Sequence, residues 1–245
     1  MAGSWHSRPP VGAQQGWQDL HQEDSMHKQW AAVDDYIAGL FPSDPVLDAV
    51  LRATRDAGMP QINVSPVQGR LLHVLALACN ARNILEIGTL AGYSAIWMAR
   101  ALPADGKLIS LEFDPKHADV ARANIVRAGL ADRVDVRLGT ALDILPQLAA
   151  EGAGPFDLIF IDADKINLTT YFDWAVCLAR PGSLIVVDNV IRGGDVLDAA
   201  SDDAGLQGVR RFNEAIAADP RVTATILQMV GSKGHDGLAL AVVRG

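Results

Sequence analysis

From residue 83 onward, short apolar runs alternate with amphipathic stretches, and this alternation limits the possible folds more than any other feature of the chain. The stretches between the runs, at about 94–101, 115–128, 141–150 and 168–179, have helical spacing. Strands separated by helices are typical of a parallel sheet that carries helices on both faces. We therefore predict a doubly wound α/β domain whose first five strands are Asn83–Ile87, Lys107–Leu111, Val134–Leu138, Leu158–Ile161 and Leu184–Val187.

The C-terminal part departs from the alternation. A predicted helix at about 205–218 is followed closely by two β-rich runs, 222–229 and 237–243. The glycine-containing link from Gly231 to Gly237 is short enough for a hairpin. One of the last two strands should therefore run antiparallel to the rest of a seven-stranded, mostly parallel sheet.

The first 80 residues form a different region. Residues 1–25 are polar and rich in turn formers, which favours a flexible tail. Helical spacing predicts an N-terminal helical extension, with helices over Met26–Leu40, Val46–Ala57 and Pro66–Ala78. Asp44 or Ser43 is suited to cap the second of them. We predict a tail over 1–25 and one domain over 26–245, with N-terminal helices at 26–80 and the α/β core at 81–245.

Composition excludes several classes of protein. The net charge of −8 disfavours a protein whose main partner is a nucleic-acid backbone, because phosphate contacts need a basic face. No secretory h-region and no run of ~18 apolar residues is present, so neither a signal peptide nor a membrane span is expected. Cys79 and Cys177 lie in apolar helical patterns, and we interpret both as buried core thiols. The chain is expected to be cytoplasmic.

The loop after the first strand, Glu86-Ile87-Gly88-Thr89-Leu90-Ala91-Gly92, has the features of a ligand site. Gly88 and Gly92 allow a tight turn and close approach of a ligand to the backbone. The loop lacks the middle glycine of the dinucleotide fingerprint, and Glu86 suits a ligand with a cationic amino-acid group better than a pyrophosphate. Glu112, at the end of the second strand, is suited to accept two ribose hydroxyls, as in NAD folds. The alternative is a tight turn with charged residues at strand ends.

Carboxylates also end two later strands. Asp162 follows the fourth strand, and Asp188 and Asn189 follow the fifth. Because ligands bind at the carboxyl ends of parallel strands, these side chains can meet in one cluster. Their oxygens suit Mg²⁺, with Mn²⁺ or Ca²⁺ as alternatives, and the lack of His or Cys disfavours Zn²⁺. The alternative for any single Asp is a helix cap; Asp164 could cap a helix that begins near Asn167.

With these motifs in place, residues from about Asn63 to Gly245 resemble the caffeoyl-CoA O-methyltransferase-like family of metal-dependent class I methyltransferases, relatives of catechol O-methyltransferase. The matching segments are Ser65-Pro66-Val67-Gln68-Gly69, Glu86 to Ser94, Ile161-Asp162-Ala163-Asp164-Lys165, Asp188-Asn189 and Asp219-Pro220-Arg221. Together they cover roughly three quarters of the chain in the order that the family has.

The resemblance implies a sheet order of 3-2-1-4-5-7-6, a homodimer, and S-adenosylmethionine (SAM) as the methyl donor. It implies that Asp162, Asp188 and Asn189 bind a divalent metal, that Asp162 also takes part in catalysis, and that Lys165 matches a proposed general base. From its position alone, Lys165 is more commonly explained by a surface site or an ion pair with Asp162 or Asp164. The cofactor contacts that the family implies are Val64, Glu86, Gly88, Thr89, Ser94, Glu112, Ala141 and Asp164.

The sequence departs from the plant members at two places. Val64 replaces a Thr, so that only main-chain contact with the cofactor can remain there. After Asp188-Asn189, Arg192 and Gly193 replace Trp and Asn, so a coenzyme A thioester acceptor does not carry over. Arg192 either meets a carboxylate on the acceptor or faces water. Trp30 and Tyr36 are candidates for a lid or a dimer contact, with packing as the alternative.

The expected reaction is methyl transfer from SAM to a hydroxyl of a catechol-like phenol, with a divalent metal that chelates the vicinal oxygens. A non-phenolic small acceptor is the nearest alternative. An NAD(P)-dependent oxidoreductase is disfavoured by the glycine loop, and a nucleic-acid methyltransferase by the acidic charge and by Ile161-Asp162-Ala163-Asp164, which stands where an Asn-Pro-Pro-aromatic tetrad is expected. A non-catalytic relative is disfavoured by the intact acidic set.

Overall fold

A single seven-stranded sheet organises the structure, a computed structural model that describes residues 11–245, with side chains from residue 25 on. Its strands are β1 (Asn83–Ile87), β2 (Lys107–Glu112), β3 (Val134–Leu138), β4 (Phe156–Ile161), β5 (Ala179–Asp188), β6 (Val222–Gly231) and β7 (Gly234–Val243). They lie in the order β3-β2-β1-β4-β5-β7-β6. Strands β1 to β5 pair in parallel, and β7 is antiparallel to both of its neighbours. The predicted fold class and sheet order are confirmed.

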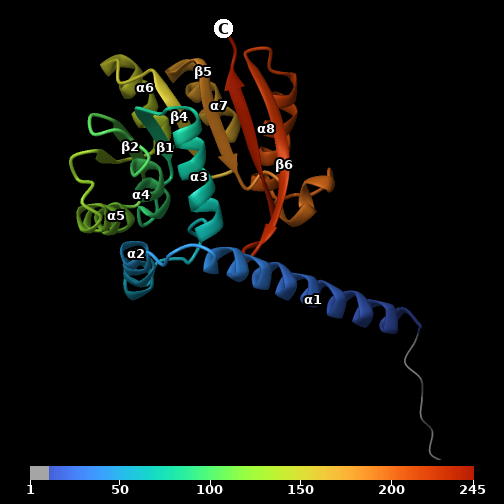
Figure 1. Cartoon of the computed structure of the whole chain (residues 1–245). Coiled ribbons are helices and arrows are strands. Elements are labelled where there is room, and N and C mark those ends of the chain that lie inside the picture. The colour runs from blue at the N-terminus through green and yellow to red at the C-terminus, as the bar shows by residue number, and fades with distance from the viewer. Residues whose placement is uncertain (1–10) are drawn as a thin grey trace, which may run out of the picture.

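Helices cover both faces of this sheet (Figure 1). They are α1 (Val11–Gly39), α2 (Pro45–Asp56), α3 (Pro66–Ala78), α4 (Tyr93–Ala99), α5 (Pro115–Arg127), α6 (Ala141–Glu151), α7 (Leu168–Leu178) and α8 (Ala204–Ala218), with a 3₁₀ turn at Arg192–Leu197. Among the described residues, no helix combines the length and the apolar composition needed to cross a bilayer.

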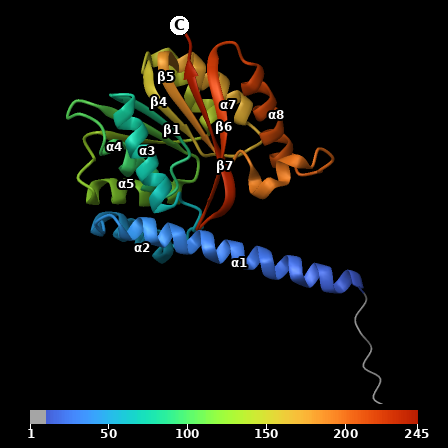
Figure 2. The ribbon, with the colours of Figure 1, turned by 45° about the vertical axis from the view of Figure 1, so that its right-hand side comes forward.

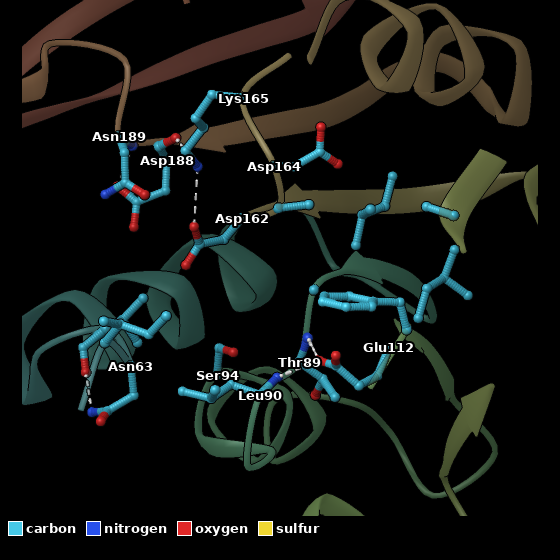
Figure 3. Close-up of a pocket in the computed structure, with 18 of the residues that line it drawn as sticks. Asn63, Thr89, Leu90, Ser94, Glu112, Asp162, Asp164, Lys165, Asp188 and Asn189 are labelled. Atoms are coloured by element: carbon cyan, nitrogen blue, oxygen red, sulfur yellow. Dashed lines mark hydrogen bonds and ion pairs between the residues drawn. The ribbon is translucent and has the colours of Figure 1, made fainter. Parts of the chain in front are cut away.

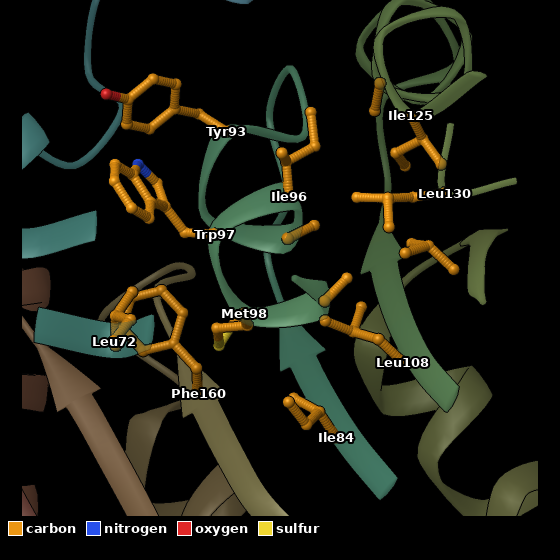
Figure 4. Packing of buried hydrophobic residues seen from close by; sticks show 14 of the residues in the cluster. Leu72, Ile84, Tyr93, Ile96, Trp97, Met98, Leu108, Ile125, Leu130 and Phe160 are labelled. Atoms are coloured by element: carbon orange, nitrogen blue, oxygen red, sulfur yellow. The ribbon is translucent and has the colours of Figure 1, made fainter. Parts of the chain in front are cut away.

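Alternate residues of the central strands enter different cores, as the period of a strand requires. On β4, Leu158 and Phe160 join a core with residues of α2 to α5 (Figure 4), whereas Ile159 and Ile161 join a second core with α6, α7 and α8. This two-sided burial explains why the strands read as continuous apolar runs.

The helix starts follow local side-chain chemistry. Asp44 caps α2 by accepting hydrogen bonds from Val46 N at 3.0 Å and Leu47 N at 3.1 Å, so Asp44 rather than Ser43 is the cap. Ser65 and Gln68 form a capping box at the start of α3. Gly69 lies where a Cβ would come within 2.3 Å of the Trp97 ring, so only glycine lets α3 and α4 pack this closely.

The N-terminal helix corrects one expectation. The predicted tail at 1–25 is helical from Val11 on, and residues 1–10 lie outside the described part. Ala, Gln, Leu and Glu residues in this segment favour a helix despite two glycines. Figures 1 and 2 show α1 extending beyond the body of the protein. Its C-terminal half is anchored where Asp34 accepts hydrogen bonds from Ser232 N at 2.8 Å and Ser232 Oγ at 3.0 Å. The side chain of Tyr36, a candidate for a lid or a dimer contact, is 68% exposed and is therefore not packed in the core of this chain.

Three further details differ from expectation. The hairpin turn contains only Ser232 and Lys233, because β6 and β7 pair as far as Gly231 and Gly234. Cys79 is half-buried at the end of α3, and Cys177 is exposed, so the prediction of two buried thiols is wrong. Cys177 lies on the solvent face of α7, opposite the apolar residues that face the sheet.

One ionisable side chain is enclosed between the sheet and α4. Glu86 on β1 is 0% exposed and accepts hydrogen bonds from Ser94 Oγ and Ser110 Oγ, each at 2.5 Å. Burial, which opposes ionisation, raises the pKa of the Glu86 carboxyl to about 7 from an ordinary 4.5. The folded protein therefore binds a proton on Glu86 at pH values where the unfolded chain has lost it.

We expect this proton to make stability pH-dependent. Since the folded pKa lies above the unfolded one, the free energy of unfolding should fall as pH rises from about 4.5 to 7, by up to about 3 kcal/mol. Glu86→Gln mimics the neutral acid and should lose this part of the pH dependence. Urea unfolding of both proteins at several pH values from 5 to 8 tests the expectation, which fails if the difference between the two free energies stays constant.

Candidate active site

A cavity of about 950 Å³ opens at the carboxyl ends of the central strands. Loops after β1, β2, β4 and β5, the start of α3 and the tip of the β6–β7 hairpin line it. All but one of the site residues predicted from sequence lie on its wall: Val64, Gly88, Thr89, Ser94, Glu112, Ala141, Asp162, Asp164, Lys165, Asp188 and Asn189. Glu86 lies behind the wall, and its hydroxyl partner Ser94 faces the cavity instead (Figure 3).

Glu112 joins the end of β2 to the glycine loop. Its Oε2 accepts hydrogen bonds from Leu90 N at 2.9 Å and Thr89 N at 3.3 Å, and its Oε1 accepts one from Asp114 N at 3.0 Å. The side chain is 5% exposed and still reaches the cavity. A carboxylate held in this way has lone pairs left for hydroxyl groups of a ligand.

The glycine loop also packs tightly against the loop after β4. Gly88 has a φ of 92°, and a Cβ there would lie 2.1 Å from the carbonyl oxygen of Asp162. Only glycine satisfies both conditions. The close approach brings the cofactor loop and Asp162 to the same cavity wall.

Val64 forms the wall beside α3. The residue is buried, and its carbonyl oxygen accepts a hydrogen bond from Asn63 Nδ2 at 2.9 Å. The residue therefore offers the cavity an apolar side chain and one partly occupied carbonyl, consistent with main-chain contact alone.

Asp162, Asp188 and Asn189 converge at the other end of the cavity (Figure 3). Strands β4 and β5 are parallel neighbours in which Ile161 pairs with Val187, so the next residue of each strand, Asp162 and Asp188, reaches the same edge. Burial and the charge of Asp162 together raise the pKa of the Asp188 carboxyl.

These groups fit a divalent cation. Two carboxylates that repel each other, with Asp188 buried and Asp162 partly buried, are stabilised by a hard cation, which also takes an amide oxygen. The described residues contain no group of three or more His, Cys, Asp or Glu that could hold a metal, so a cation bound between Asp162 and Asp188 would need the Asn189 amide oxygen as a third protein ligand.

Lys165 lies against this cluster. Its Nζ is 3.3 Å from Asp162 Oδ1 and donates a hydrogen bond to the Asp188 carbonyl oxygen at 3.2 Å, and its side chain is 12% exposed. Helix α8 supports the segment closely, because a Cβ on Gly208 would lie 2.1 Å from the Lys165 carbonyl oxygen. The ion pair with Asp162 is thus present, and Lys165 is also within reach of a ligand in the cavity.

Asp164 points away from the acidic cluster (Figure 3). Its Oδ1 accepts hydrogen bonds from Asn167 N at 3.2 Å and Asn167 Nδ2 at 2.8 Å, and its Oδ2 accepts one from the Tyr171 hydroxyl. Asp164 therefore holds the turn before α7, but the N-cap of α7 is Asn167, so Asp164 does not cap this helix; Asp164 also lines the cavity. Cofactor contact by Asp164 stays a prediction.

Several residues of the cavity wall were not found from sequence. Asn63, His117, Tyr171, Lys233 and Asp236 all line it. Lys233 and Asp236 lie in the segment that we interpreted only as a hairpin link, and chain pairing brings them to the cavity. The Asp219-Pro220-Arg221 motif lies elsewhere: Arg221 donates to both Asp219 and Asp173, which ties the start of β6 to α7.

Comparisons with known proteins agree with this geometry. The chain is 61% identical over 216 residues to a catechol O-methyltransferase of Niastella koreensis, which covers 87% of this chain and 97% of that protein. It is 54% identical to a catechol O-methyltransferase of Mycobacterium tuberculosis, over 84% of this chain and 91% of that protein. The crystal structure of an O-methyltransferase from Bacillus cereus in complex with SAH superposes with a TM-score of 0.88 at 54% identity, over 89% of this chain and all of that one.

A second solved structure is similar over the same region. The O-methyltransferase TomG from Streptomyces achromogenes, in complex with SAM, superposes with a TM-score of 0.86 at 48% identity, over 89% of this chain and 99% of that one. The sequence pattern of the O-methyltransferase family itself matches residues 41–243. With a match that covers the whole sheet and the cavity wall, the chain belongs to the O-methyltransferase family.

Proposed function

We propose that this protein transfers the methyl group of SAM to a hydroxyl of a catechol-like phenol, with a divalent cation that holds two vicinal oxygens of the acceptor. The observation that carries the proposal is one cavity with two chemically different ends. The glycine loop and Glu112 form one end, and Asp162, Asp188 and Asn189 form the other. The names of the similar enzymes from Niastella koreensis and Mycobacterium tuberculosis support a catechol acceptor.

The donor belongs at the glycine loop. Gly88 allows the backbone to approach a ligand, and Glu112, held by Thr89 N and Leu90 N, has acceptor capacity left for ribose hydroxyls. Ser94 presents a hydroxyl beside this loop and is fixed by Glu86. The SAH and SAM complexes of the similar structures support this placement.

The acceptor belongs at the acidic end. A divalent cation bound by Asp162, Asp188 and Asn189 would lower the pKa of a bound phenolic hydroxyl and fix its direction. Lys165, at 3.3 Å from Asp162 Oδ1, is placed to take the hydroxyl proton or to balance charge. The phenolate oxygen then forms a bond to the methyl carbon while the bond from carbon to sulfur breaks, which leaves a neutral thioether. Homodimer assembly and a cytoplasmic location stay predictions.

Removing the cation should abolish most activity. Orientation of the two reactants can contribute ~7–11 kcal/mol, whereas one proton-transfer group contributes ~10²–10⁴-fold in rate. We therefore expect EDTA to suppress methylation of catechol, Mg²⁺ to restore it, and Asp162→Ala to lose more kcat than Lys165→Ala. Asp202→Ala, at an exposed carboxylate outside the cavity, is the control. Undiminished turnover in EDTA, or a more active Asp162→Ala than Lys165→Ala, would contradict this account.

The donor end can be tested by binding alone. Loss of a hydrogen bond to a charged acceptor costs about 1.5–3 kcal/mol. Glu112→Gln should therefore raise the Kd of SAH roughly tenfold or more in calorimetric titration. NADH should bind measurably neither to the wild-type protein nor to this variant. Glu151→Gln is the control, because it makes the same change of side chain at an exposed position. Glu151 is the last residue of α6 and pairs with Arg137 on β3. Equal SAH affinities of the two variants would argue against the assignment of Glu112.

A further inference from the structure

The segment after β5 adopts an unusual backbone conformation. Asn189 has a φ of 61° and Arg192 a φ of 56°, the left-handed region that side chains other than glycine rarely adopt. Such conformations persist only when surrounding contacts impose them. Both residues line the cavity, so whatever imposes this conformation also sets the directions of Asn189 and Arg192.

Asn189 N donates to Asp188 Oδ1 at 2.7 Å, whereas one oxygen of another carboxylate holds the amides of residues 191 and 192. Asp236 Oδ1 accepts hydrogen bonds from Ile191 N at 3.0 Å, from Arg192 N at 2.9 Å and from Gly237 N at 2.9 Å. Ladder pairing between β5 and β7 ends at the Asp188–Leu238 pair, so the amides of Ile191 and Arg192 have no backbone partner on β7. Asp236 on β7 takes the place of that partner.

The surrounding packing holds the segment against the same strand. Val190 N donates to the Gly237 carbonyl oxygen at 3.2 Å, and Asn213 Nδ2 on α8 donates to the Val190 carbonyl oxygen at 2.8 Å. A Cβ on Gly237 would lie 2.4 Å from Ile191 Cγ1, so the segment lies directly on the β7 backbone. These contacts fix Val190 and Ile191, and only Asp236 reaches the Arg192 amide among the hydrogen bonds of the described residues.

We propose that Asp236 is a positioning residue for the acceptor end of the cavity, which acts by accepting hydrogen bonds from the 191–192 amides and thereby sets the directions of Asn189 and Arg192. The role needs an acceptor oxygen at one place and does not need a negative charge. The proposal rests on the proposed function for its effect on catalysis, whereas its effect on the backbone is independent of that function.

Three variants separate acceptor geometry from charge. Asp236→Asn keeps an acceptor oxygen and removes the charge; Asp236→Glu keeps the charge and displaces the oxygen by one methylene; Asp236→Ala removes both. Asp44→Ala is the matched control, because Asp44 also accepts two backbone hydrogen bonds through one oxygen, at 3.0 and 3.1 Å, but does not line the cavity.

The first measurement is hydrogen exchange, which requires neither cation nor acceptor. We expect the amides of residues 189–194 to exchange faster in Asp236→Ala and Asp236→Glu than in the wild type, and at wild-type rates in Asp236→Asn and Asp44→Ala. Unchanged exchange in Asp236→Ala would overturn the proposal, and so would equally fast exchange in Asp236→Asn. If Asp236→Ala does not fold, the pair Asp236→Asn and Asp236→Glu gives the same comparison.

The second measurement is ligand binding. Loss of groups that orient metal ligands typically costs about 10–100-fold in affinity or activity. Asp236→Ala and Asp236→Glu should therefore raise the Kd of Mn²⁺, measured by electron paramagnetic resonance, by about 10–100-fold. The KM of catechol should rise by a similar factor. The Kd of SAH should stay within about twofold of the wild-type value. An equal loss of SAH affinity would show general disruption and overturn the proposal. Wild-type protein that binds no Mn²⁺ would contradict the proposed function alone, since the exchange comparison still tests Asp236.

Discussion

The approach of two carboxylates at neighbouring strand ends is the constraint on which the rest of the site depends. Parallel pairing of β4 and β5, with Ile161 opposite Val187, leaves no freedom in where Asp162 and Asp188 emerge. Burial and the neighbouring charge of Asp162 both oppose ionisation of Asp188, and this cost appears as the raised pKa of the Asp188 carboxyl. The fold tolerates the cost because hydrophobic burial on both faces of β4 and β5 fixes the register. Lys165 offsets part of the charge through its ion pair with Asp162.

The two ends of the cavity are joined through backbone contacts rather than side chains. Gly88 lets the donor loop lie against the Asp162 carbonyl oxygen, so the position of the proposed donor and that of the acidic cluster are set by one contact. Gly208 on α8 likewise allows a close backbone contact, because its lack of a Cβ lets α8 pack against the Lys165 carbonyl oxygen. Rigid elements therefore hold each functional group, which is the arrangement that in-line transfer between two bound molecules requires.

The parts of this structure that depend on local pattern were predictable from the sequence. Apolar runs that alternate with helical stretches specify the strands, and acidic residues at the carboxyl ends of β2, β4 and β5 mark the edge where ligands bind. The role of Asp236 was not predictable, because its partners Ile191 and Arg192 are 45 and 44 positions away and meet it only through the β5–β7 pairing. The helix from Val11 to residue 25 was not predictable from local pattern, because its polar residues and glycines are also typical of a tail. The exposure of Cys177 follows from its face of α7, which helical spacing could have indicated.

The most direct test of the central claim is an anomalous-scattering experiment on crystals of the protein grown with Mn²⁺ and SAH. The account predicts one strong anomalous peak within bonding distance of oxygens from Asp162, Asp188 and Asn189, on the side of the cavity opposite Glu112. A map without a peak at these residues, or with the peak at another group of side chains, would contradict it.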